Sequence, residues 1–214
     1  MSITEVFLPG WGFRSSIWQL YYPNKPNRKF IDLSDFNHNN ENEVLFKLQQ
    51  AIPNNSIIYA WSISCLWLLK LLQQQLIEVR KLYLFSPPLA FNLKNSDQQQ
   101  CFVERYMSAP KSLAKKFIQL VAYPATDKNL YKLLQQHCQL NDQSRYLHYL
   151  NHLRWMFRFS LSDQKLIALL ASVDYEIILG VEDAIIDSLA ISRLLKLPAI
   201  QHCGHLTMMA IKKG

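Results

Sequence analysis

Short runs of apolar and β-branched residues alternate with longer segments of helical periodicity along much of this chain. Each short run stops at turn residues or at the start of a helical segment, which is typical of buried strands. Strands are predicted over residues 4–8, 29–33, 56–60, 80–85, 175–180 and 197–201. Helices are predicted over residues 41–51, 63–76 and 187–195. This alternation indicates the α/β class, with a mainly parallel sheet covered by helices on both faces.

One long segment interrupts the alternation. Between residues 91 and 162 no strand is predicted, and amphipathic stretches rich in Gln, Lys, Leu and Tyr break near Pro110, Pro124 and Asn141. We interpret residues 91–162 as a helical cap inserted into a core formed by residues 1–90 and 163–214. A chain of 214 residues fits one domain with an insertion better than two independent domains.

Composition narrows the class of protein. The four cysteines, Cys65, Cys101, Cys138 and Cys203, form no C-x-x-C pair, so neither a disulfide framework nor a thiolate metal site is predicted. We therefore expect no metal and no cofactor. The first twenty residues hold Pro9, Gly10, Gly12 and Arg14, and no apolar run has the length of a membrane span. We expect a soluble, cytoplasmic monomer.

The charge of the chain is moderately positive. There are 23 Lys and Arg residues against 16 Asp and Glu residues, which gives a formal net charge of +7. The basic residues are spread among apolar positions and form no nucleic-acid-binding motif, so no nucleic-acid partner is expected. The excess of positive charge suits an acidic partner of another kind.

Ser62 is the candidate nucleophile. It lies in Ala60-Trp61-Ser62-Ile63-Ser64, between a predicted strand and a predicted helix, where a sharp turn presents a serine hydroxyl at the edge of the sheet. The nucleophile-elbow pattern is G-x-S-x-G, and here Ala60 and Ser64 replace the two glycines. An N-cap role for Ser62 is the structural alternative.

A serine hydroxyl needs a base and an orienting acid before it attacks an acyl group. His205 follows the last predicted strand, beside Gly204, and is the candidate base. Asp183 lies just past the strand at 175–180 and is the preferred acid, with Glu182 and Asp187 as rivals. The chain order of serine, aspartate and histidine is the order found in α/β-hydrolases.

An oxyanion would be stabilised by backbone N–H groups near the nucleophile. The loop Pro9-Gly10-Trp11-Gly12 follows the first predicted strand, so the N–H of Trp11 is one candidate donor. The N–H of Ile63, directly after the serine, is the other. A plain turn is the alternative interpretation of the glycine-flanked loop.

Several of these motifs together resemble a known family. They are Phe7 to Gly12 with Trp18, Ala60 to Ser64, Phe85-Ser86-Pro87-Pro88, Gly180-x-x-Asp183 and Gly204-His205. The set resembles the α/β-hydrolases that act as pimeloyl-[acyl-carrier protein] methyl ester esterases in biotin synthesis, of the BioH and BioG types. The sequence departs from that pattern at Pro9, where a histidine is usual, and at Ala60 and Ser64.

The resemblance implies an α/β-hydrolase fold and an acyl-enzyme formed on Ser62 from the methyl ester of pimeloyl-acyl-carrier protein. It also implies that the cap receives the acidic carrier protein through basic residues and holds the acyl chain among aromatic ones. The candidates for carrier binding are Lys111, Lys115, Lys116, Arg145, Arg154 and Arg158, and those for the acyl slot are Trp155, Phe157 and Phe159. A solvated helix face and a packed core are the respective alternatives.

Two other functions remain open from the sequence. A thioesterase or general short-chain carboxylesterase would use the same triad without a basic cap. A catalytically degenerate homologue that only binds an acyl carrier is the third, favoured by the altered elbow and disfavoured by the presence of Ser62, Asp183 and His205 in order.

Overall fold

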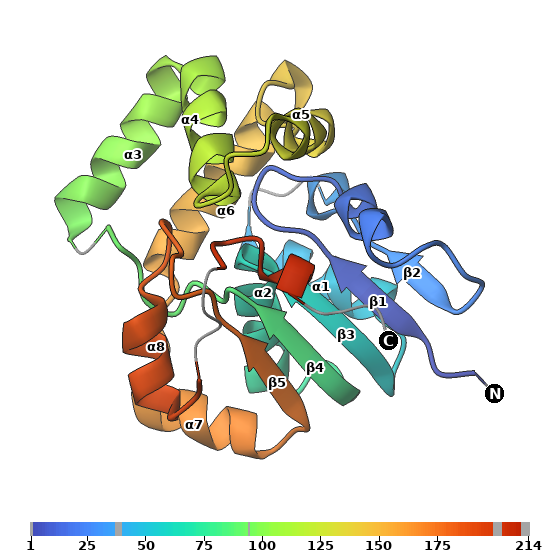
Figure 1. Ribbon diagram of the computed structural model, residues 1–214. Coiled ribbons are helices and arrows are strands. Elements are labelled where there is room, and N and C mark those ends of the chain that lie inside the picture. Colours follow the sequence, from blue (N-terminus) through green and yellow to red (C-terminus); the bar gives the residue numbers. More distant parts are fainter. Residues whose placement is uncertain (1, 37–39, 94, 199–202, 211–214) are drawn as a thin grey trace.

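The computed structural model describes residues 2–36, 40–93, 95–198 and 203–210. Within these residues one parallel sheet has the strand order β2-β1-β3-β4-β5 (Figure 1). The strands are β1 (Glu5–Leu8), β2 (Arg28–Phe30), β3 (Ser56–Trp61), β4 (Val79–Phe85) and β5 (Tyr175–Ile178). The predicted fold class is confirmed.

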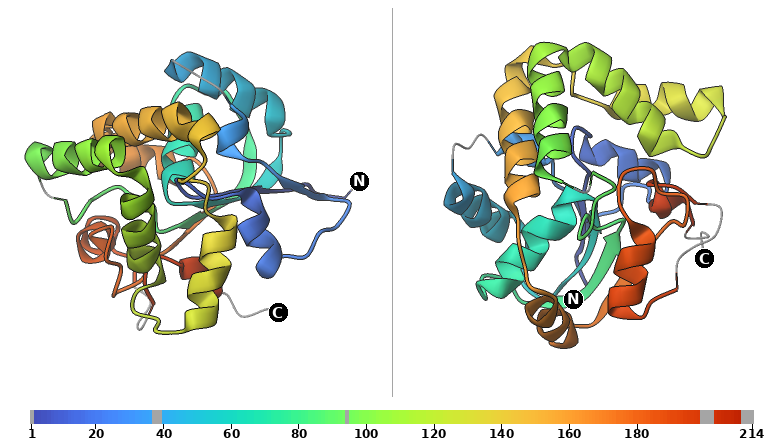
Figure 2. Two further views of the ribbon diagram at one scale, coloured as in Figure 1. Left: turned by 90° about the horizontal axis from the view of Figure 1, so that it is seen from above. Right: turned by 90° about the vertical axis from the view of Figure 1, so that its left-hand side faces the viewer.

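Helices cover both faces of the sheet, as Figure 2 shows, with α1 and α2 on one face and α8 on the other. The core helices are α1 (Glu41–Ala51), α2 (Ile63–Gln73), α7 (Asp163–Ala171) and α8 (Ser188–Leu195). Short 3-10 helices are η1 (Ser15–Leu20), η2 (Leu33–Asp35), η3 (Gln143–Arg145) and η4 (Thr207–Ala210). Nearly every side chain of α2 is buried, which explains its almost continuous apolar sequence.

Four further helices lie over the carboxyl ends of the strands (Figure 1). They are α3 (Ser96–Ser108), α4 (Pro110–Ala122), α5 (Lys128–His137) and α6 (Tyr146–Arg158). All of them belong to the segment 91–162 and carry one apolar face, which packs inward, and one polar face. No helix of the described residues has both the length and the apolar character that crossing a membrane requires.

The strand register brings three loops to one edge of the sheet. Leu8 of β1 is level with Ala60 of β3, and Trp61 is level with Phe85 of β4. The loops that follow these strands therefore begin side by side, and ligand sites of parallel α/β sheets form at this carboxyl edge.

The strand predicted over residues 197–201 is not seen in its described part. Residues 197 and 198 carry no strand, and residues 199–202 lie outside the described part of the chain. Lys196 adopts a left-handed conformation at the end of α8, and the N–H of Leu197 donates to the carbonyl of Ser192 at 2.9 Å. Leu197 thus completes the helix end instead of entering the sheet.

Candidate active site

Ser62 occupies a strained turn between β3 and α2. Its backbone φ is 55° and its ψ is −123°, a combination that residues with a side chain rarely adopt and that costs about 1–3 kcal/mol. Its N–H donates to the carbonyl of Phe85 at 2.8 Å, which fixes the turn against β4. The Ser62 side chain makes no capping hydrogen bond to α2. The N-cap alternative therefore has no support in the structure, and the turn has the form of a nucleophile elbow.

Ser64 takes the place of the second elbow glycine and is fully buried. Its hydroxyl donates a short hydrogen bond to the carbonyl of Pro9, in the loop after β1. The extra side chain is thus accommodated by a bond between the elbow and the loop that carries Trp11.

Replacing Ser64 tests this bond. We expect Ser64→Ala to lower the free energy of unfolding by about 1–3 kcal/mol, because the buried carbonyl of Pro9 loses its donor. Urea denaturation measures the change, with Ser112→Ala on the exposed face of α4 as the control. Equal stability of the two variants would show that the bond contributes nothing.

His205 and Asp183 form a buried pair. The Nδ1 atom of His205 lies 2.8 Å from Oδ2 of Asp183. The other carboxylate oxygen of Asp183 accepts from the N–H groups of Ile185 and Ile186, at 2.8 and 3.1 Å. Asp187 instead accepts from the N–H of Ala190 and caps α8. Of the rival acids, Asp183 is therefore the one that reaches the histidine.

Two opposing effects set the pKa of Asp183. Burial raises the pKa, but the charge and hydrogen bond of His205 and the two backbone N–H donors lower it more, so that the pKa lies below its ordinary value. The carboxylate therefore stays ionised at neutral pH. An ionised, buried acid holds the His205 ring with Nδ1–H toward it and leaves Nε2 as the basic atom.

The Nε2 atom of His205 is buried and has no hydrogen-bond partner among the described residues. Ser62 Oγ and this nitrogen are therefore not hydrogen-bonded in this structure. Catalytic hydrogen bonds are often long without substrate and tighten in the complex. A buried acceptor without a donor is costly, and a hydrogen bond donated by the serine hydroxyl would satisfy it.

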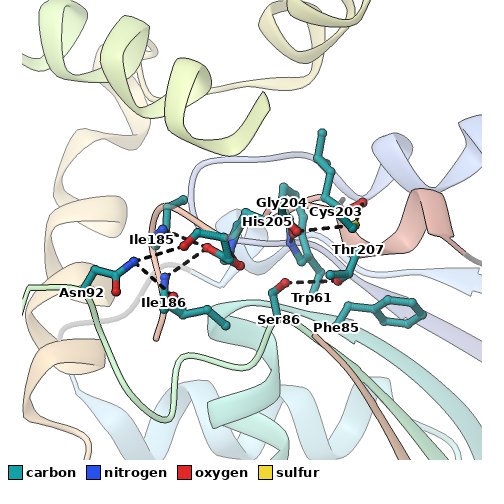
Figure 3. A network of polar contacts seen from close by, with 12 residues as sticks. Trp61, Phe85, Ser86, Asn92, Ile185, Ile186, Cys203, Gly204, His205 and Thr207 are labelled. Atoms are coloured by element: carbon teal, nitrogen blue, oxygen red, sulfur yellow. Dashed lines mark hydrogen bonds and ion pairs between the residues drawn. The ribbon is translucent and has the colours of Figure 1, made fainter. Parts of the chain in front are cut away.

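The loop after β5 that carries Asp183, here called the acid loop, is in backbone contact with the loop that carries His205, here called the base loop. A Cβ atom at Gly180 would lie only 2.1 Å from the carbonyl oxygen of Cys203, so only glycine fits there. Asn92, at the start of the cap segment, donates from its side-chain amide to the carbonyls of Asp183 and Ile186, both at 3.1 Å. Figure 3 shows Asn92 beside Ile186. Asn92 supports the acid loop, and no local pattern in the sequence marked it.

A cavity of about 300 Å³ opens between Ser62 and the cap. Ser62 and Trp11 line it, together with apolar side chains that include Phe102, Leu113, Phe117, Leu153, Met156 and Phe157. The indole N–H of Trp11 donates to the carbonyl of Tyr149 at 2.8 Å, which ties the loop after β1 to α6. Ile63 is the first residue of α2, so its N–H has no acceptor within the helix.

The aromatic residues predicted for the acyl slot lie in two different cavities. Phe157 lines the Ser62 cavity, whereas Trp155 and Phe159 line a different cleft between α1, α2 and α6. Trp155 stacks on Trp67 with ring centroids 3.5 Å apart, and its indole N–H donates to Glu41 at 2.9 Å. Residues two positions apart point to opposite sides of a helix, which explains the separation. The placement of Trp155 and Phe159 in the slot is corrected accordingly.

The basic residues of the cap also differ in their surroundings. Arg145 forms ion pairs with Asp35 at 3.3 Å and Asp142 at 3.6 Å, so it serves the fold. Arg154 and Arg158 line a cleft between α3 and α6 together with Phe157, and Lys115 lies exposed on α4. Among the described residues, Lys116 and Arg105 are the cations that border the Ser62 cavity.

The arrangement was compared with known proteins. The sequence matches no family model and no curated protein. Its structure is similar to that of a hydrolase from Oleispira antarctica, at 12% identity and a TM-score of 0.76, over 99% of this chain and 87% of that chain. The chain has the α/β-hydrolase fold.

Two further solved structures are similar to this chain. MenH from S. aureus matches at 14% identity and a TM-score of 0.72, over 95% of this chain and 86% of that chain. BioG from Haemophilus influenzae matches at 13% identity and a TM-score of 0.61, over 94% of this chain and 88% of that chain. The α/β-hydrolase fold thus extends over almost the whole chain and contains the helices α3 to α6.

Proposed function

We propose that this protein is a serine ester hydrolase with Ser62 as nucleophile, His205 as base and Asp183 as orienting acid. The main support is the buried His205–Asp183 pair, in which Nε2 of His205 has no hydrogen-bond partner among the described residues. The pair lies at the carboxyl edge of the sheet, where Ser62 is held in a strained turn. Strain and an unpaired buried nitrogen are costly, and a catalytic role accounts for both.

The reaction follows from these groups. Ser62 Oγ attacks the ester carbonyl while Nε2 of His205 takes its proton, and the resulting oxyanion accepts from the N–H groups of Trp11 and Ile63. The tetrahedral intermediate expels the alcohol, which receives the proton from His205. Water, deprotonated by the same nitrogen, then attacks the acyl-enzyme. The bond between the acyl carbon and Ser62 Oγ breaks, His205 returns the proton to Oγ, and the acid is released.

For the substrate we propose the methyl ester of pimeloyl-acyl-carrier protein. The motif set that resembles this family of esterases supports it, as does the structural likeness to BioG. The cavity is small and mostly apolar, which suits a short acyl chain, and Arg105 and Lys116 at its border suit an acidic carrier. Lys115, Arg154 and Arg158 extend this positive surface over α4 and α6 in the proposal.

The substrate assignment is tested by incubating purified protein with pimeloyl-acyl-carrier protein methyl ester and following the mobility of the carrier protein. Loss of the methyl group is expected. Hydrolysis of short aryl esters or acyl thioesters alone would leave the serine hydrolase and overturn the carrier substrate. Binding of the carrier without turnover of any ester would favour the degenerate, binding-only function.

A charge-reversed variant tests the carrier surface separately. We expect Arg105→Glu with Lys116→Glu to lower kcat/KM for the carrier-linked ester by about tenfold or more, since charge complementarity accelerates association. A small neutral aryl ester should be affected much less, and added salt should weaken the wild-type advantage. Lys165→Glu, exposed on α7, is the matched control. An equal loss on both esters would contradict the carrier surface.

A further inference from the structure

Trp61, the residue directly before Ser62, contacts the base loop. Its indole N–H donates to the backbone carbonyl of His205 at 3.0 Å, and both side chains are buried (Figure 3). The indole also lies beside the imidazole, with ring centroids 5.6 Å apart. The bond spans 144 positions of sequence, so it connects two parts of the chain that only the fold brings together.

The same indole limits the position of the loop after β1. A Cβ atom at Gly10 would lie 2.9 Å from the Trp61 ring, so the backbone of Gly10 packs directly on it. Phe13 of the same loop packs on the ring from a centroid distance of 5.0 Å. The Trp61 side chain therefore contacts two loops: the loop that carries Trp11, the proposed oxyanion donor, and the loop that carries His205. Trp61 itself lies directly before the nucleophile.

A second contact holds the base loop from another side. The hydroxyls of Ser86 and Thr207 lie 3.1 Å apart and both residues are fully buried (Figure 3). Ser86 follows β4, and Thr207 is two positions after His205. Within the described residues, the backbone around His205 is thus fixed on one side by β4 and on the other by Trp61.

We propose that Trp61 is a positioning residue for catalysis, whose indole N–H holds the His205 backbone at the distance from which Nε2 serves Ser62. The proposal rests on the proposed function of the triad. No hydrogen bond of Nε2 within the described residues sets its distance to Ser62, so a shift of the His205 backbone would change that distance directly. A bond from the residue beside the nucleophile to the carbonyl of the base restricts that movement directly.

The test is Trp61→Phe, assayed on a short aryl ester. We expect kcat to fall by about 10- to 100-fold with KM nearly unchanged, because a misplaced base slows proton transfer without altering the acyl cavity. The rate at which a fluorophosphonate modifies Ser62 should fall by the same factor, since that step needs the same base.

Trp67→Phe is the matched control. Trp67 is equally buried on α2, but its indole N–H has no partner among the described residues, so the variant loses similar volume and no such bond. We expect a similar fall in Tm for the two variants and a fall in kcat only for Trp61→Phe. Equal kcat in the two variants would overturn the proposal.

A second replacement covers the case in which Trp61→Phe is too unstable to assay. Benzothienylalanine placed at position 61 keeps the shape of the indole and lacks the N–H group. The same loss of kcat is expected, and a wild-type rate would overturn the proposal. If the wild-type protein itself hydrolyses no ester and resists the fluorophosphonate, the proposed function fails instead, and the two failures are distinguished.

Discussion

Ser62→Ala is expected to lower kcat for ester hydrolysis by about six orders of magnitude, to the level left by binding and the oxyanion donors. No other group can form the acyl-enzyme in the proposed mechanism, and the elbow conformation survives because alanine is smaller than serine. The measurement is turnover of the carrier-linked methyl ester and of an aryl ester by purified variant and wild type.

Binding provides the internal control for this prediction. The Ser62→Ala variant should still bind the carrier-linked ester, because the cavity walls and the cations at its border are untouched. Ser112→Ala should keep full turnover. A Ser62→Ala variant that retains more than a small part of the wild-type rate would show that another residue is the nucleophile.

Asp183→Asn is expected to lower kcat by about 10⁴-fold, because an amide cannot hold the His205 ring in the tautomer that leaves Nε2 basic. KM should change little, since Asp183 does not line the cavity. Asp187→Asn is the matched control: asparagine also caps helices well, so this variant should keep both its fold and its rate. A large loss in Asp187→Asn with none in Asp183→Asn would exchange the two roles.

The lowered pKa of Asp183 adds a signature in acid. A carboxyl group whose pKa is lower in the folded state stabilises the fold above its unfolded pKa of about 3.9, and loses this contribution as pH falls through the folded value. The stability advantage of wild type over Asp183→Asn should therefore be full near neutrality and shrink below about pH 4. Urea titrations across that range measure it, and an advantage that grew in acid would contradict the ionised pair.

Some residues of the candidate site are marked by their neighbours in the sequence, and others are identified only by contacts in the folded chain. Ser62 and His205 could be singled out as candidates from the sequence, because Ser62 lies at a strand-to-helix junction and His205 lies beside Gly204. The sequence favoured Asp183 but left Glu182 and Asp187 open, since all three lie near one loop and only the folded backbone decides which carboxylate points at the imidazole. Nothing in the sequence distinguished Trp155 from Phe157. In the structure α6 is oriented so that Phe157 lines the Ser62 cavity and Trp155 lines the cleft beside α1 and α2.

The sequence by itself determined the α/β class, the strands before the cap, and the strand-to-helix junction at Ser62, because hydrophobic periodicity and turn residues act over a few neighbouring positions. The tertiary structure alone decided which carboxylate contacts His205, the walls of the cavity, and the bond from Trp61 to the carbonyl of His205. These depend on contacts between residues far apart in the chain, which are set by the packing of helices on the sheet and leave no local pattern.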